Sequence, residues 1–201
     1  PNTIFHVDAI QAYGKLPIVP KNMGIDLLST SGHKIHGPKG IGFLYIKEGT
    51  KISPIIFGGG QQKGMRSGTE NVPGIVGLAV ACEKMIGKNY ENAEKIREVK
   101  EYFQERIKEI EDIKDNSGKA PHVASISFKK LRSEVLLHAL EDREIYVSSG
   151  SACSSNKKQA VSGTLNAIAL SDEFKDGTLR FSFSIENTKE EVDETIKALK
   201  E

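Results

Sequence analysis

The chain has little of what would place it in a membrane, in a disulfide-rich fold or on a nucleic acid. It contains 2 cysteines among 201 residues, no tryptophan, no apolar run of membrane-spanning length and no signal-like N-terminus. Its 28 basic and 27 acidic residues are interspersed and nearly cancel, which argues against a polyanion-binding surface. We therefore expect a soluble protein of a reducing compartment, the cytoplasm, with neither nucleic acid nor membrane as a partner.

The length allows one large domain, or one small domain plus part of another. The sequence also lacks an initiator methionine and opens within an apparent strand, Thr3–Asp8. We therefore expect these 201 residues to be the later part of a longer protein.

The first 70 residues alternate short apolar runs with glycine and proline, a pattern typical of buried strands in an α/β sheet. The runs are TIFHVD, IDLLSTS and GIGFLYIK. Pro73 then opens a helix with apolar residues at 75, 76, 78, 79, 82 and 86. Spaced apolar residues and i,i+4 charge pairs predict one long amphipathic helix from Asn89 to Asp112.

The remaining sequence predicts a second α/β unit. Strands are expected at VASISF, IYVSS and TLRFSF, and helices at 133–143, near 160–170 and at the C-terminus, where Thr188-Lys-Glu-Glu191 forms a capping box. We therefore predict an α/β fold, with part of a larger domain in residues 1–87 and a smaller domain in residues 88–201.

Chemically versatile side chains gather in Ser31-Gly-His-Lys-Ile-His-Gly-Pro-Lys-Gly40, directly after the predicted strand IDLLST. The ends of strands are where open α/β sheets bind ligands. An amine desolvated at such a place has a lowered pKa and can form a Schiff base with a carbonyl, which makes Lys34 a candidate. A plain basic loop remains the alternative. His33 and His36 lack a carboxylate or thiol at ligand spacing, so we expect no metal site.

The strand Phe5-His-Val-Asp8 predicts a carboxylate at the same edge. Alternation places His6 and Asp8 on one face, with Gln11 just beyond. A carboxylate there can pair with a protonated heteroaromatic nitrogen, as the pyridine ring of an aldehyde cofactor requires. Alternatively, Asp8 caps the turn that follows it.

Two further stretches carry oxyanion-binding residue types. Gly58–Asn71 combines glycines with Arg66, Ser and Thr69, which suit a phosphate, although a flexible turn would also be rich in glycine. Arg180 lies in the predicted strand LRFSF without an acidic neighbour. It either faces solvent or grips a carboxylate through both arms of its guanidinium group.

The segment SSGSACSSN, residues 148–156, surrounds one thiol with small side chains. It has neither strand nor helix periodicity, so we expect an exposed loop that leaves Cys153 accessible. Cys82 lies in the apolar stretch GLAVACEK, and we expect it to be core packing.

Taken in order, HVDAIQ, SGHKIHGPKG, the GGGQ-to-RSGTEN stretch, SSGSACSS and LRFSF resemble the cysteine desulfurases of the nitrogen-fixation and iron–sulfur-cluster type. These are pyridoxal-phosphate enzymes of the class V aminotransferase superfamily with the type I fold. The resemblance covers essentially the whole chain, as the C-terminal half to two-thirds of a family member. The long SSGSAC form matches the branch with an extended cysteine loop.

The resemblance implies a cofactor site in the first unit. Lys34 would hold pyridoxal 5'-phosphate as a Schiff base, Asp8 would pair with the ring nitrogen and Gln11 would bond the ring hydroxyl. The phosphate would be held by Ser31, His33 and, from the other subunit of a homodimer, Thr69.

It also implies the substrate chemistry. Arg180 would grip the carboxylate of L-cysteine, and Cys153 would take the sulfur as a persulfide, leave alanine and deliver the sulfur to an acceptor or scaffold protein. Family members are about twice this length, so activity would require the missing N-terminal segment. Selenocysteine cleavage, a related pyridoxal-phosphate reaction and an inactive interaction module are the alternatives.

Overall fold

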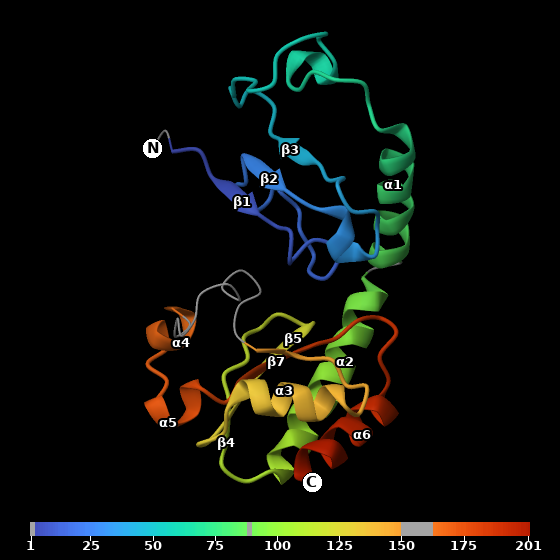
Figure 1. Cartoon of the computed structure of the whole chain (residues 1–201). Coiled ribbons are helices and arrows are strands. Elements are labelled where there is room, and N and C mark those ends of the chain that lie inside the picture. The colour runs from blue at the N-terminus through green and yellow to red at the C-terminus, as the bar shows by residue number, and fades with distance from the viewer. Residues whose placement is uncertain (1–2, 88–89, 150–162) are drawn as a thin grey trace. The chain divides into compact units, whose positions relative to one another are not determined.

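The computed structural model describes residues 3–87, 90–149 and 163–201, and the chain divides into two compact units, Pro1–Ala93 and Glu94–Glu201 (Figure 1). Each unit has its own sheet. Within the described ranges, no helix is both long enough and apolar enough to cross a bilayer.

The first unit contains a three-stranded sheet in the order β1-β2-β3. Strand β1 (His6–Asp8) runs parallel to β2 (Leu27–Ser29), and β3 (Leu44–Ile46) pairs with β2 in the antiparallel sense. The predicted apolar runs thus do form strands, although each strand is only three residues long. Ala9, Ile25 and Leu28 form a small buried cluster that is part of the core of this unit.

Helix α1 (Val72–Ile86) packs against the 3-10 turn η1 (Gly32–Ile35) of the same unit. Asn71 caps the helix by accepting the amide N–H of Gly74 at 3.1 Å. A Cβ on Gly77 would lie 2.7 Å from Pro38 Cγ, so glycine permits this close approach.

The buried face of α1 differs from the expected one. The structure buries Gly74, Leu78, Ala81 and Met85, whereas Ile75 is 43% exposed and Val76 is 56% exposed. The sequence places apolar residues on two faces of this helix, and the described chain covers only one of them.

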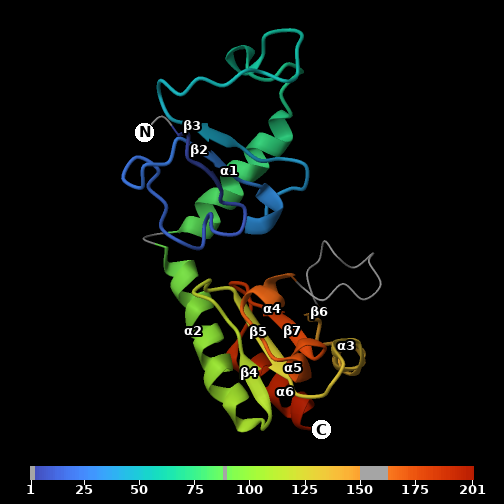
Figure 2. The same cartoon turned by 90° about the vertical axis from the view of Figure 1, so that its left-hand side faces the viewer.

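The second unit is built on an antiparallel sheet in the order β4-β5-β7-β6 (Figure 2). Its strands are β4 (Ile113–Asp115), β5 (Val123–Phe128), β7 (Thr178–Ser182) and β6 (Ser148–Ser149). Most predicted strands are present, but IYVSS contributes only its last two residues. Strand β4 was not predicted, because IKD holds a single apolar residue.

Helices α2 (Glu91–Arg106), α3 (Ser133–Glu141) and α6 (Lys189–Lys200) share one core with β5 and β7. Phe103 of α2 packs on Phe181 of β7 with ring centroids 4.7 Å apart. Thr188 and Glu191 form the predicted capping box of α6. The expected 89–112 helix ends earlier, since the 3-10 turn η3 (Ile107–Glu109) follows α2.

Between β6 and β7, residues 163–177 contain two short helices, α4 (Gly163–Ala167) and α5 (Asp172–Lys175). The helix predicted near 160–170 therefore corresponds in part to α4. Cys153 lies outside the described residues.

Candidate functional site

The carboxyl ends of β1 and β2 bring two predicted site segments to one edge of the first sheet. Asp8 and Ser29 are register partners in these parallel strands, so the chain leaves both strands at the same end. The segment after β1 carries Gln11, and the segment after β2 carries Ser31, His33 and Lys34. This edge is the location that open α/β sheets use for ligands.

The predicted alternation along β1 is present. His6 and Asp8 are exposed, and Val7 between them packs against the small core. His6 Nε2 shares a hydrogen bond of 3.1 Å with Ser29 Oγ, which ties the exposed faces of the two strands together.

Asp8 uses one carboxylate oxygen locally. Its Oδ1 accepts the amide N–H of Ile10 at 3.0 Å, which is the capping contact of the alternative interpretation. The side chain makes no further hydrogen bond or ion pair with a described residue, so a carboxylate oxygen remains for a ligand.

The turn η1 presents Ser31, His33 and Lys34 outward. Ser31 Oγ and His33 Nδ1 lie 2.7 Å apart, so the hydroxyl and the ring form one polar pair. The neighbouring Gly32 and Ile35 are buried and face α1, while His33 and Lys34 are exposed. We expected Lys34 to be desolvated, but among the described residues its side chain is exposed.

The glycine-rich segment 58–71 adopts backbone conformations that need glycine. Gly58 has φ +150°, and a Cβ there would lie 3.2 Å from the Ser67 side chain. Ser67 is buried, and the Arg66 guanidinium donates to the Ser67 carbonyl oxygen at 3.0 Å. Among Arg66, Ser67 and Thr69, the expected phosphate donors of this segment, only Thr69 combines an exposed side chain with the absence of a hydrogen bond to a described residue.

Arg180 belongs to the second unit and has an unsatisfied donor. It lies opposite Ser148 in the β6–β7 pair and donates from Nη2 to Ser148 Oγ at 3.1 Å. Its Nε is buried without a hydrogen-bond partner among the described residues. An unpaired buried donor costs about 1–3 kcal/mol, which a carboxylate ligand would offset. The side chain is half-buried, so it is not on a fully wet face.

The other cysteine is part of the first unit's packing. Cys82 is half-buried in α1. Burial, and after it the neighbouring Cys82 side chain, raises the pKa of Tyr13 to about 12. This agrees with a packing role for Cys82.

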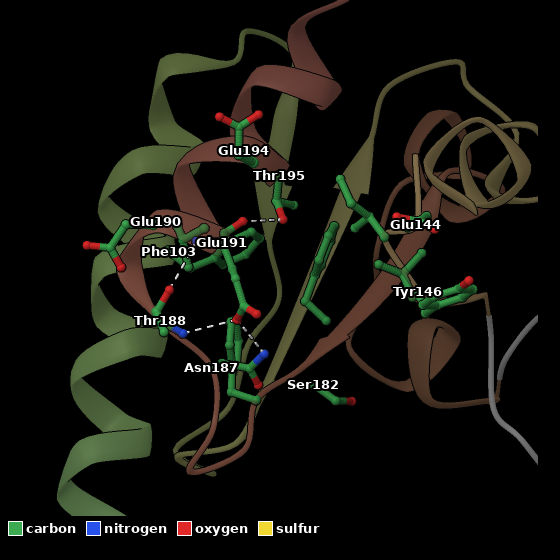
Figure 3. A pocket seen from close by; sticks show the side chains of 15 residues that line it. Phe103, Glu144, Tyr146, Ser182, Asn187, Thr188, Glu190, Glu191, Glu194 and Thr195 are labelled. Atoms are coloured by element: carbon green, nitrogen blue, oxygen red, sulfur yellow. Dashed lines mark hydrogen bonds between the residues drawn. The ribbon is translucent and has the colours of Figure 1, made fainter. Parts of the chain in front are cut away.

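None of the predicted site residues that the structure describes lines a cavity of about 570 Å³ in the second unit (Figure 3). Phe103 and Phe181 contribute to its apolar wall, and Glu190 and Glu191 to its acidic rim. Figure 3 shows Tyr146 and Glu144 across the cavity from these acidic side chains of α6. Glu191 is already engaged, because it accepts from the Thr188 amide at 3.1 Å in the capping box.

One residue near the first site was not predicted. Lys15 is buried, and its Nζ donates to the carbonyl oxygen of Lys34 at 2.9 Å. The signal in the sequence is weak: a Gly-Lys pair shortly after the Asp8–Gln11 motif. No group of three or more His, Cys, Asp or Glu side chains in the described part of the chain has a metal-binding arrangement.

These features of the first unit can be compared with known proteins. The family model for "Aminotransferase class-V" matches residues 1–195. The chain belongs to this family. It shares the α/β, type I fold of NifS-like, pyridoxal-phosphate-dependent cysteine desulfurases.

Among curated relatives, the cysteine desulfurase IscS of Dictyoglomus turgidum is 40% identical over 199 residues, which are 97% of this chain and 50% of that protein. IscS of Clostridium botulinum is 42% identical over 204 residues, covering 98% and 51%. The chain therefore spans about half the length of the curated relatives it matches.

Solved structures of related proteins are also similar to this chain. A NifS-like protein from Rickettsia africae superposes with a TM-score of 0.85 at 30% identity, covering 98% of this chain and 52% of that chain. A structure described as SspA in complex with cysteine matches with a TM-score of 0.69 at 34% identity, covering 92% and 51%.

Proposed function

We propose that this chain contributes the cofactor lysine, the substrate-binding arginine and the sulfur-accepting cysteine of a pyridoxal-phosphate-dependent cysteine desulfurase. The observation that carries the proposal is the exposed Lys34 on η1, beside the Ser31–His33 pair and at the sheet edge where β1 ends in Asp8. Relatives named cysteine desulfurase, and a neighbour solved with cysteine bound, support the choice of substrate.

The residues of this edge fit the cofactor chemically. An exposed primary amine, a carboxylate with a remaining oxygen and a hydroxyl–imidazole pair are the groups that an aldehyde, a pyridinium nitrogen and a phosphate require. When bound, pyridoxal 5'-phosphate supplies a reactive aldehyde and an electron-withdrawing ring.

Each side chain then has a distinct task. Lys34 would hold the aldehyde through its amine, and Asp8 would pair with the ring nitrogen and keep it protonated. Gln11 would orient the ring through its hydroxyl. Ser31 and His33 would donate to the phosphate, and Thr69 would reach the phosphate of a second subunit in a homodimer.

Substrate binding and sulfur transfer involve the other unit's residues. The guanidinium of Arg180, whose Nε lacks a described partner, binds the carboxylate of L-cysteine. The Cys153 thiolate would attack the substrate sulfur. The carbon–sulfur bond of the substrate would break with its electron pair going to the carbon, which takes up a proton to give alanine, while the sulfur stays on Cys153 as a persulfide. An acceptor or scaffold protein then receives the sulfur for iron–sulfur cluster or other cofactor assembly.

The exposed apolar face of α1 supports a further part of the proposal: the remaining half of the protein packs there. Val72 is 60% exposed and Val80 is 44% exposed, on the same helix as the exposed Ile75 and Val76. Apolar residues contiguous on one helix favour burial against another element. The unmatched half of the relatives' length provides that element, and with it the missing cover over Lys34.

Reductive trapping tests the cofactor assignment. The chain is incubated with pyridoxal phosphate, alone and co-expressed with the other half of a family member, then reduced with borohydride and digested for mass spectrometry. We expect the label on Lys34 rather than on Lys39, which is also exposed and lies in the same loop. Lys34→Ala should abolish the label and Lys39→Ala should leave it.

The outcomes separate the two parts of the proposal. Labelling of Lys34 only in the co-expressed pair supports both. Selective labelling and cysteine turnover by the 201-residue chain alone would contradict the need for the other half. Equal labelling of Lys34 and Lys39 in both preparations would contradict the cofactor assignment itself.

A further inference from the structure

Lys15 connects the two segments that carry the predicted cofactor residues. It lies in the turns after β1, four residues beyond Gln11, and its side chain is only 6% exposed. Its Nζ donates to the carbonyl oxygen of Lys34 at 2.9 Å, and Lys34 belongs to the segment after β2. One hydrogen bond therefore joins the two chain segments at the cofactor edge.

Burying the Lys15 ammonium costs free energy of desolvation unless an opposite charge or hydrogen bonds compensate it. Desolvation lowers the pKa of Lys15, and the nearby charge of Lys34 lowers it further. None of the ion pairs between described residues includes Lys15, so no carboxylate compensates the cost. A methionine would fill similar space without that desolvation cost.

The backbone amide of Lys34 is held less tightly than the ends of its turn, where the Gly32 amide donates to the Ile41 carbonyl at 2.8 Å and the Gly37 amide to the Gly32 carbonyl at 2.9 Å. The turn η1 is four residues long, and Ser31 at its start gives no side-chain cap because its hydroxyl pairs with His33. The Lys34 amide reaches the Ser31 carbonyl at 3.3 Å, near the long limit for such a bond. A charge-assisted bond to the Lys34 carbonyl is roughly twice as strong as a neutral one.

The backbone at Gly14 allows Lys15 to reach this carbonyl. Gly14 has φ +77°, and a Cβ there would lie 2.9 Å from Met85 Cγ and 3.1 Å from Ile35 Cγ2. Only glycine fits this close contact between the turn after β1, helix α1 and η1. The Gly14-Lys15 pair thus inserts against the inner side of η1 while Lys34 extends from its outer side.

We propose that Lys15 is a positioning residue for the cofactor lysine: its buried ammonium fixes the Lys34 carbonyl, and with it the backbone from which the exposed Lys34 side chain extends. The inference rests on the proposed function in one respect, the identity of Lys34 as the cofactor lysine. Lys15 touches neither substrate nor cofactor and acts through the backbone of Lys34.

Lys100 offers a matched control in the other unit. It is also buried, and its Nζ donates to the carbonyl oxygens of Gly118 and Ala120 at 2.8 Å each. Burial lowers the pKa of Lys100 as it does that of Lys15. Lys100→Met therefore reproduces the loss of a buried lysine–carbonyl contact without touching η1.

The experiment compares wild type, Lys15→Met and Lys100→Met in the preparation in which Lys34 accepts pyridoxal phosphate. The readouts are the ratio of Lys34 to Lys39 labelling after borohydride reduction and the hydrogen exchange of the amides of residues 34–37. We expect Lys15→Met to lower the labelling ratio and speed the exchange by roughly tenfold each, the equivalent of losing one charged hydrogen bond. Lys100→Met should change neither. Lys15→Gln replaces Lys15→Met if that variant does not fold.

Three outcomes are decisive. A lower labelling ratio together with faster amide exchange in the Lys15 variant, and in that variant alone, supports the inference. An unchanged labelling ratio in a folded Lys15 variant overturns it, whatever happens to stability, and leaves the proposed function intact. If no preparation of the wild type labels Lys34 selectively, the proposed function fails first and the inference fails with it.

Discussion

Asp8 and Ser29 lie opposite each other at the ends of β1 and β2, and each strand continues into a segment of the candidate cofactor site. This pairing explains why residues more than twenty positions apart in the sequence reach one edge of the sheet. It places the carboxylate of Asp8 beside the strand that leads into Ser31 and Lys34, and every proposed cofactor contact of the first unit except that of Thr69 originates there.

Asp8 has two possible roles, and two substitutions separate them. Asp8→Asn keeps an oxygen for the Ile10 amide but removes the charge, whereas Asp8→Ala removes both. We expect Asp8→Ala to cost about 1 kcal/mol of stability, and Asp8→Asn much less. In the assembled enzyme both should lower kcat/KM for cysteine roughly a hundredfold, since the ring nitrogen loses its anionic partner. Near-normal activity of Asp8→Asn would reduce Asp8 to a turn cap.

Arg180→Lys should weaken substrate binding while keeping the positive charge. Lysine cannot offer the planar, two-armed geometry of the guanidinium, and the unpaired Nε donor disappears with it. We expect KM for cysteine to rise roughly tenfold or more, with a smaller change in kcat. Arg143→Lys, at an exposed arginine of the same unit, is the control. Equal KM values for all three proteins would rule out a carboxylate contact.

Introducing a charged side chain on the exposed apolar face of α1 tests whether another part of the protein packs against it. Val76→Glu places a carboxylate on a side chain that is 56% exposed in this chain, so the fold of the isolated chain should survive. Assembly with the other half of the protein should fail, because burial would desolvate the charge. Glu83→Lys, at an exposed polar site of the same helix, should assemble normally. Sedimentation of the co-expressed pair measures this. Loss of self-association alone would indicate that a second copy covers α1 instead.

Acid stability should depend on Glu109. Arg106 and then Lys200 stabilise its carboxylate and lower its pKa to about 2 from an ordinary value near 4.5. Because the folded pKa is the lower one, this stabilisation is complete above pH 4.5 and is lost as the pH falls toward 2. Glu109→Gln should flatten the decline of Tm over that range. Glu105→Gln, which removes a single ion pair with Lys108, is the comparison. Parallel Tm curves for wild type and Glu109→Gln would contradict the assignment.

Much of the fold follows from local patterns in the sequence. Apolar runs located the strands that carry Asp8 and Arg180, and the capping box located the start of α6 at Thr188. These signals are local, so a single sequence contains them. The lengths of the strands, and the existence of the short strand β4, depend on pairing with neighbouring strands. No local sequence pattern encodes that pairing.

The candidate site was only partly predictable for a related reason. Ser31, His33 and Lys34 were identified because reactive side chains cluster after a strand, but Lys15 was missed because its partner is a backbone carbonyl, which has no sequence signature. The exposure of Lys34 and of the second face of α1 also differed from expectation. Burial at both places requires elements that the described residues do not contain.

Sulfur transfer to Cys153 tests the central claim most directly. The assembled protein is loaded with pyridoxal phosphate, incubated with L-cysteine and digested, and the mass of the peptide containing Cys153 is measured beside that of the Cys82 peptide. We predict that the Cys153 peptide gains one sulfur atom in wild type and in Lys39→Ala but not in Lys34→Ala, while the Cys82 peptide stays unchanged. Sulfur on Cys153 in the Lys34→Ala protein, or none in a wild type that still converts cysteine to alanine, would contradict the account.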